Sequence, residues 1–168
     1  MTKREKRIIP NLMIQLQLCD NFRDALIFTS YITRTHKGII ESIYEKNIEI
    51  FEQIGVDLNF NVIDFLIKNN INTQTSNLYI IRQKETNFFK VGITTDLEKR
   101  FSAIQTGNPA DLEIKYNENF FLCETIEKNI HKHLELFHIR GEWFQMTPNK
   151  LKQLIEKLEK LIFKNEQN

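Results

Sequence analysis

LYII at residues 78–81 and FFKVGI at residues 88–93 are the two runs that decide the fold of this chain. Both are apolar and rich in β-branched or aromatic residues, and the polar segment 83–87 between them is typical of a hairpin turn. We therefore predict two antiparallel strands. On such a hairpin Tyr79 and Lys90 lie on neighbouring strands, so their side chains can serve one site.

A helix is predicted directly after the second strand. Residues 95–98 (Thr-Asp-Leu-Glu) match a capping box, and Gly107 is a typical helix end. Arg100 lies beside the apolar stripe of this helix. The stripe consists of Leu97, Phe101 and Ile104. A guanidinium group at that position either has a carboxylate or phosphate partner or lies along the apolar surface with its charge in water.

The second half of the chain continues with one more strand and two helices. Residues 112–122 alternate between apolar and polar side chains and predict a third strand. Residues 124–138 predict a helix on whose flank Glu127 and His131 lie one turn apart, and a Thr-Pro pair opens the last helix. We expect an α+β fold with a small three-stranded antiparallel sheet flanked by helices.

Residues 1–76 are expected to form an all-α N-terminal region, because their apolar residues recur at helical spacing and the polar stretch 69–77 marks a boundary. Residues 77–168 then form the second domain, which ends in a helix. The N-terminal region holds equal numbers of basic and acidic residues, so its charge does not indicate nucleic-acid binding. We expect it to brace the second domain or to form a homo-oligomer, and gripping nucleic acid is the alternative.

Composition is typical of a globular protein of the cytoplasm. The chain has 168 residues, of which 41% are hydrophobic, which is enough for a packed core without cross-links. Its two cysteines, Cys19 and Cys123, form no disulfide or metal motif, which fits a reducing compartment. No apolar run approaches the roughly 20 residues of a membrane span, and no signal-peptide core follows the basic residues 3–7. The net charge of +1 neither requires nor excludes a polyanionic partner.

Chemistry-bearing side chains gather on the hairpin and on the two helices that follow it. Tyr79, Lys90 and Arg100 are groups that can surround one phosphate. Glu127 can bind a hard divalent cation such as Mg²⁺, which commonly uses one or two carboxylates together with water and substrate phosphate. His131 is then expected to orient neighbouring groups or to donate a hydrogen bond, and not to bind the metal. For Glu127 and His131 a solvated helix flank is the alternative.

Glu142 lies between a glycine and two aromatic residues, where an unpaired carboxylate would be costly to bury. Its partner could be Arg140, Arg100 or a metal ion, and the sequence does not choose among them. A zinc site is a weaker alternative to magnesium, because two of the three nearby histidines point about 200° apart on a helix and no thiolate pair accompanies them. The three histidines are His131, His133 and His138.

Three ordered segments carry a resemblance to a known family. KVGIT at residues 90–94, QTGNP at residues 105–109 and GEWF at residues 141–144 follow one another at compatible spacing. Together they resemble the GIY-YIG endonuclease superfamily, in particular its compact phage and bacterial branch. The resemblance covers about residues 78–144 and leaves residues 1–76 outside it.

This resemblance implies an α/β sandwich around a three-stranded antiparallel sheet. It also implies metal-dependent hydrolysis of nucleic-acid phosphodiesters in a phage or mobile element, with DNA as the expected substrate and Mg²⁺ or Mn²⁺ as the cofactor. Residue by residue, it places Tyr79, Lys90, Arg100 and His131 among the catalytic residues, the metal at Glu127 and a supporting role at Gly92. We expect Thr94 and Glu142 to be further supporting residues.

Two positions depart from the family pattern. Asn77 opens the first motif in place of its glycine, and Lys90 replaces the tyrosine of the second motif. A lysine with an ordinary pKa of about 10.4 acts as a base only if burial or neighbouring cations lower that value. Either Tyr79 or Lys90 could therefore assist the attacking water.

Two other functions stay open. A catalytically degenerate module could hold DNA or RNA with the same arginine and lysines, and an interaction protein could use the sheet as a scaffold. The enzyme is favoured because Tyr79, Arg100 and Glu127 occur together, and phosphate binding alone needs no metal-binding carboxylate.

Overall fold

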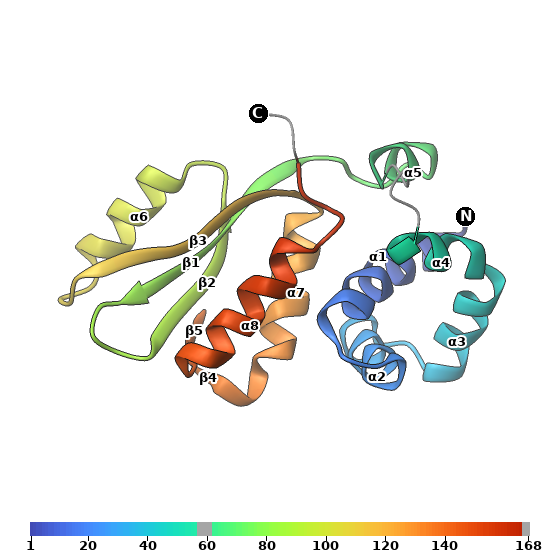
Figure 1. The fold of residues 1–168 in the computed structure, drawn as a ribbon. Helices are drawn as coiled ribbons and strands as arrows, with labels where there is room; N and C mark the ends of the chain where they lie inside the picture. Colours follow the sequence, from blue (N-terminus) through green and yellow to red (C-terminus); the bar gives the residue numbers. More distant parts are fainter. Residues whose placement is uncertain (57–61, 166–168) are drawn as a thin grey trace. The chain divides into compact units, whose positions relative to one another are not determined.

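The computed structural model describes residues 1–56 and 62–165 (Figure 1). The chain divides into two compact units. The N-terminal unit comprises Met1–Thr73 with Lys160–Ile162, and the sheet unit comprises Gln74–Glu159 with the segment that begins at Phe163. Among the described residues, no helix is both long and apolar enough to span a membrane.

The N-terminal unit is built from helices. Its first helix begins after Thr2, whose side chain completes a capping box with Glu5. Pro10 lies inside this helix. It is tolerated because Ile9 and Leu12 are fully buried, and such burial outweighs one missing backbone hydrogen bond. The helices are α1 (Lys3–Leu18), α2 (Phe22–Thr33), α3 (Lys37–Lys46), α4 (Ile48–Val56) and α5 (Val62–Lys68).

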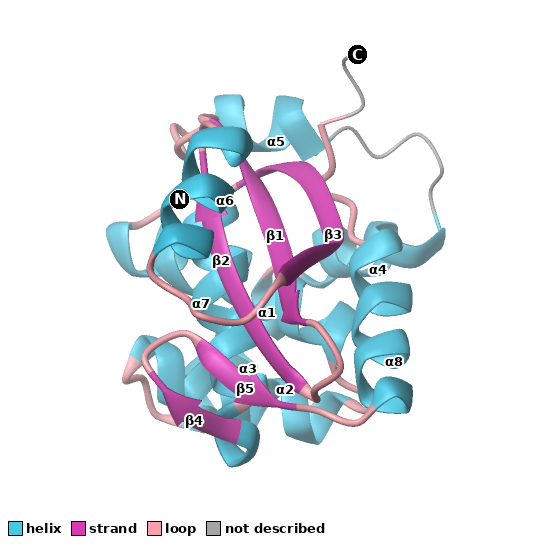
Figure 2. Cartoon of the chain, turned by 90° about the vertical axis from the view of Figure 1, so that its left-hand side faces the viewer, coloured by secondary structure: helices cyan, strands magenta, loops and turns pink. Residues whose placement is uncertain are grey.

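The sheet unit contains, within its described residues, five antiparallel strands in the order β3-β1-β2-β5-β4 (Figure 2). The class is α+β, but the expectation of three strands is wrong. The two unpredicted strands have three residues each, which is too short for an alternating pattern to show. The strands are β1 (Thr75–Gln83), β2 (Phe88–Thr94), β3 (Leu112–Phe121), β4 (His138–Arg140) and β5 (Trp143–Gln145).

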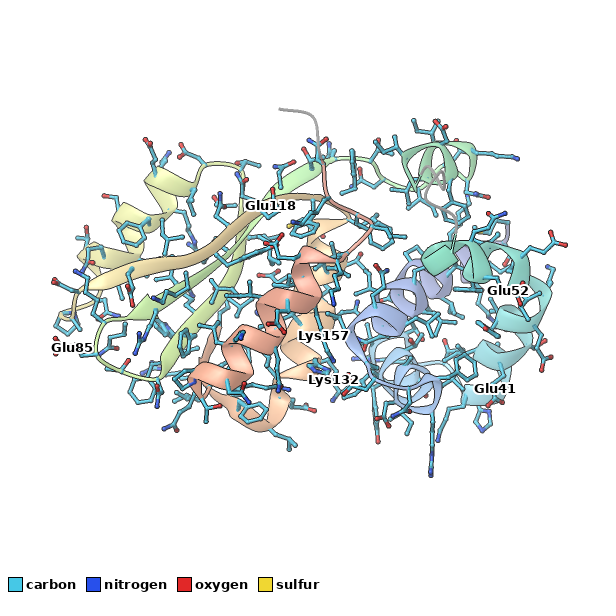
Figure 3. All side chains as sticks on the ribbon, viewed as in Figure 1. Glu41, Glu52, Glu85, Glu118, Lys132 and Lys157 are labelled. Carbon is cyan, nitrogen blue, oxygen red and sulfur yellow. The ribbon has the colours of Figure 1, made fainter. Side chains whose placement is uncertain are left out.

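The β1–β2 hairpin is the centre of this sheet. Its register pairs Tyr79 with Gly92 and Ile81 with Lys90. The turn that joins the strands includes Glu85, which has a φ of 59° and lies at the tip of the hairpin (Figure 3). The hairpin therefore forms as the polar segment predicts, and it places Tyr79 and Lys90 on the same face of the sheet.

Helices cover both faces of the sheet (Figure 1). On one face α6 packs its apolar residues against a cluster that contains Tyr79 and Ile81. On the other face α7 contacts β1 and β2. The helices are α6 (Leu97–Thr106), α7 (Cys123–His133) and α8 (Pro148–Glu159), and a short 3-10 helix, η1, spans Glu135–Phe137.

Two helix boundaries differ from the sequence-based expectation. The N-cap of α6 is Asp96, whose Oδ1 accepts a hydrogen bond of 3.0 Å from the backbone N–H of Lys99. Thr95 therefore precedes the cap. The helix predicted over residues 124–138 ends at His133, because the chain turns through η1 and enters β4 at His138. This early end is what allows the β4–β5 hairpin to join the sheet.

Candidate functional site

Tyr79 and Gly92 form the floor of the site on neighbouring strands. The Tyr79 side chain is fully buried. A Cβ atom at position 92 would stand 2.5 Å from Tyr79 Oη and 2.7 Å from Tyr79 Cζ. Glycine is therefore required at this position, because any larger residue would push the phenol ring aside.

Arg100 reaches this phenol from α6. Its Nε donates a hydrogen bond of 3.0 Å to Tyr79 Oη, while its side chain stays 42% exposed. Burial raises the pKa of Tyr79, although Arg100 acts in the opposite direction. Tyr79 is therefore a protonated phenol near neutral pH, with Oη oriented by the guanidinium group.

Glu142 enters the site from the turn between β4 and β5. Gly141 has a φ of 57°, which suits glycine at a tight turn. The carbonyl oxygen of Gly141 accepts a hydrogen bond of 2.8 Å from His138 Nε2, and the carbonyl oxygen of Glu142 accepts one of 3.1 Å from the backbone N–H of Val91. The backbone at Glu142 is thus held on both sides of the turn.

The Glu142 carboxylate joins the two cations of the site. Its Oε2 lies 2.5 Å from Lys90 Nζ and 3.6 Å from Arg100 Nη2. The Lys90 side chain is only 12% exposed, so its ammonium group requires such a counter-charge. Of the partners that the sequence left open, the structure selects Arg100 and adds Lys90.

His131 lies on α7 at the edge of β2. Its Nε2 is 2.9 Å from the carbonyl oxygen of Val91, and because a carbonyl only accepts, Nε2 carries the hydrogen. The imidazole ring also packs on Phe144, with the ring centroids 5.1 Å apart. The tautomer and orientation of His131 are therefore fixed by β2 and β5.

Glu127 lies one turn before His131 on the same helix and is half-buried. Burial raises its pKa, nearby His131 acts in the opposite direction, and the charge of Glu142 raises it further. The carboxylate makes no hydrogen bond or ion pair with the residues that the structure describes. The charge of Glu127 raises the pKa values of Tyr79 and Arg100, so Glu127 lies within electrostatic range of both groups.

Thr94 hydrogen-bonds to the turn that precedes α6. Its Oγ1 donates to the carbonyl oxygen of Asp96 at 2.9 Å and accepts from the Asp96 backbone N–H at 3.1 Å. Thr94 therefore shapes the turn that leads into α6, the helix that carries Arg100.

Two further basic residues of the sheet unit have acidic partners of their own. Lys84 lies 3.4 Å from Asp111, and Lys132 lies 2.5 Å from Glu135. Among the described residues, no cluster of three histidine, cysteine or acidic side chains is arranged to hold a metal. The zinc alternative therefore has no support from the arrangement of these side chains.

Two members of the site were not predicted. The carbonyl oxygen of Val91 holds His131, and the Phe144 ring lies between His131 and His138, with the second pair of centroids 5.7 Å apart. The backbone carbonyl of Val91 could not be predicted, because every residue has such a group and the sequence does not show which one binds the imidazole. Phe144 belongs to the GEWF segment, but the segment alone does not show that its ring contacts both histidines.

Comparison with known proteins bears on the sheet unit. Residues 77–159 match the family model of the T5orf172 domain. This range is just under half of the chain and contains every site residue described above. No curated protein and no solved structure matches the chain.

The family match corrects the resemblance drawn from the sequence. The matching model is that of the T5orf172 domain, a family different from GIY-YIG, so the assignment to GIY-YIG is wrong. The three segments KVGIT, QTGNP and GEWF do lie within the matched range. The T5orf172 domain is nuclease-like and associated with nucleic acid, which is compatible with a nucleic-acid-related function.

Proposed function

We propose that this chain is a metal-dependent endonuclease that hydrolyses nucleic-acid phosphodiesters, with DNA as its substrate. One observation carries the proposal. The cations of Lys90 and Arg100 meet at the Glu142 carboxylate, and Arg100 also binds the phenol of Tyr79. Arg100 and Tyr79 lie within electrostatic range of Glu127, whose carboxylate has no partner among the described residues. Cations and a metal-binding carboxylate in one neighbourhood suit a phosphodiester. The T5orf172 match supports a nucleic-acid substrate.

The residues present fit a magnesium or manganese ion. Glu127 offers an unpaired carboxylate with a raised pKa, and a hard cation would relieve the cost of burying that charge. Magnesium commonly needs only one or two protein carboxylates, because water and substrate phosphate supply the remaining oxygens. When bound, the ion would supply Lewis-acid stabilisation of negative charge on the phosphate.

Arg100 is the principal phosphate-binding residue in this proposal. Its Nε is fixed by Tyr79 at 3.0 Å, and its Nη2 is 3.6 Å from Glu142, beyond ordinary hydrogen-bond length. The guanidinium group is thus oriented but not saturated. A phosphate can bind its terminal nitrogens in a bidentate manner and can draw on the same positive charge in the transition state.

Lys90 and Tyr79 have different roles in this proposal. The ion pair of 2.5 Å with Glu142 presents Lys90 as an ammonium donor, so we assign it to the phosphate. Tyr79 accepts a hydrogen bond from Arg100 and keeps its own hydroxyl hydrogen. We assign Tyr79 to the attacking water. Because its side chain is fully buried, it orients that water through Arg100 or through a second water. His131 holds the adjoining edge of β2 through the carbonyl oxygen of Val91.

A second candidate is a nucleic-acid-binding module that does not cut. One observation favours it: no group of three histidine, cysteine or acidic side chains that could hold a metal occurs among the described residues. Lys90 and Arg100 would then bind phosphates without any metal ion.

The test is incubation of the full chain with labelled single-stranded DNA, double-stranded DNA and RNA, each with Mg²⁺, Mn²⁺ or EDTA. Glu127→Ala and Arg100→Ala are compared with Lys152→Ala, which removes a cation that is 75% exposed on α8. We expect metal-dependent cutting of DNA that is lost in the first two variants and kept in the third. Binding without cutting would support the second candidate, and cutting that survives in all variants would overturn the assigned site.

A further inference from the structure

A second feature of the sheet unit lies beside the site and has no role in the proposed chemistry. It is an open pocket of about 330 Å³ formed by η1, β4, the end of β5 and the β1–β2 turn. This volume is at the lower end of the range for pockets that bind small molecules. It suits a single planar ring system rather than a large ligand.

The walls of this pocket combine apolar surface with unpaired amides. Phe137 and the buried Met146 provide apolar surface, and Lys150 Nζ lies 5.6 Å from the centroid of the Phe137 ring. Asn87 and Gln145 are exposed, and their side-chain amides make no hydrogen bond with described residues. Primary amides match the donor and acceptor edges of nucleobases, and aromatic surface stacks on their faces.

The pocket is coupled to the site through two contacts. The Phe144 ring lies between His131 of the site and His138 of the pocket wall. His138 also donates to the carbonyl oxygen of Gly141, which precedes Glu142. Along β5, Gln145 is three residues from Glu142, a span of about 10 Å in a strand. About three stacked nucleotides cover that distance.

We propose that this pocket binds one unpaired nucleobase of the substrate strand, a few nucleotides from the phosphate held by Arg100. The proposal rests on the proposed nucleic-acid function but not on cleavage. Asn87 and Gln145 read the edge of the base, and Phe137 supplies the apolar wall. An exposed apolar rim, with Leu136 at 95% and Ile139 at 49% exposure, shields the bound base from water.

The test uses the full chain in EDTA, so that no substrate is consumed. A single-stranded oligonucleotide of about 12 nucleotides is prepared with one abasic position that is moved along the strand. We expect one abasic position to weaken binding by roughly 10-fold, because stacking one base contributes about 1–3 kcal/mol. That penalty should disappear in Asn87→Ala/Gln145→Ala and should persist in the control Gln153→Ala, which replaces an exposed amide on α8.

Each other outcome has a defined meaning. Normal affinity with no sensitive position, or a penalty that persists in the double variant, would overturn the base pocket while leaving the proposed function intact. An absence of binding to any oligonucleotide would count against the proposed function itself. If Leu136→Ser instead changes the molecular mass measured by light scattering, the pocket belongs to an interface between copies and the base proposal fails.

Discussion

The two units of this protein each contain a carboxylate that pairs with a lysine, and the two pairs are built differently. In the N-terminal unit, Glu5 Oε1 lies 2.7 Å from Lys46 Nζ, and Glu5 Oε2 accepts a hydrogen bond of 2.6 Å from the backbone N–H of Thr2. Lys46 and Thr2 together lower the pKa of Glu5 to about 2. The fold itself supplies everything that this carboxylate needs.

In the sheet unit the carboxylates are not fully paired by the fold itself. Glu142 is shared between Lys90 and Arg100, while Glu127 keeps a raised pKa and has no partner among the described residues. This difference distinguishes a structural ion pair from a functional site. In a structural pair every charged group has its partner within the fold, and the pair stabilises the fold. In a functional site some groups lack a partner in the fold and can bind a ligand.

The largest expected effect comes from Arg100→Ala. Removing a preorganised donor to the transition state should lower the cutting rate by roughly 100- to 1,000-fold. The free energy of unfolding should change by no more than about 1 kcal/mol, since this side chain is 42% exposed. Single-turnover cleavage and denaturant unfolding measure the two quantities. A large loss of stability with an unchanged cutting rate would show that Arg100 has a structural role and would contradict its assignment to the site.

Gly92→Ala should lower both the cutting rate and the free energy of unfolding. The added methyl group would stand 2.5 Å from Tyr79 Oη, so the buried ring must move, at a cost of about 1–3 kcal/mol of stability. The chain has one tryptophan, Trp143, whose fluorescence follows unfolding of the sheet unit. The matched control is Gly107→Ala, where the nearest atom to the new methyl is 3.7 Å away. Equal behaviour of the two variants would contradict the close packing of Tyr79 on Gly92.

Exchanging each acidic partner for its amide sharpens the comparison further. Glu142→Gln leaves the Lys90 ammonium without its counter-charge and should lower cutting by ~10-fold through misplaced cations. Glu5→Gln should instead destabilise the fold by about 1 kcal/mol through the weakened capping box, with cutting unchanged. Far-UV circular dichroism melting and cleavage rates test both. If Glu142→Gln and Glu5→Gln both changed only the cutting rate, or both changed only the stability, the distinction between the two carboxylates would be wrong.

The smallest effect concerns pH. The pKa of Glu127 is raised above its ordinary value of 4.5, so metal-dependent cutting should decline on acidification before pH 4.5 is reached. The pKa of Glu5 is lowered from 4.5 to about 2, so its contribution to stability is present above pH 4.5 and is lost as pH falls toward 2. A pH–rate profile and acid unfolding of the same sample should therefore show cutting lost first.

The central hairpin and α6 could be predicted because their signals are local. Short continuous runs of apolar, β-branched and aromatic residues define β1 and β2, and the helix that follows brings Arg100 back to Tyr79 within a short stretch of chain. The partners of Glu142 could not be predicted in the same way. They depend on β4 and β5, two strands of three residues whose pairing is set by tertiary contacts and not by periodicity.

His131 illustrates a different limit. Its position one turn from Glu127 follows from helical geometry, and the sequence placed both residues near the site. Its partner is the carbonyl oxygen of Val91, and every residue type has that group. Only the packing of α7 against β2 shows which carbonyl is used.

The most direct test of this account is single-turnover cleavage of DNA in Mg²⁺ by the parent chain, Glu127→Gln and Glu124→Gln. Glu124 lies on the same helix and its side chain is 79% exposed, so its variant controls for the loss of one acidic residue. We predict that Glu127→Gln cuts at least ~100-fold more slowly while Glu124→Gln cuts like the parent. Equal cutting by Glu127→Gln and the parent would contradict the assignment of the metal-dependent site.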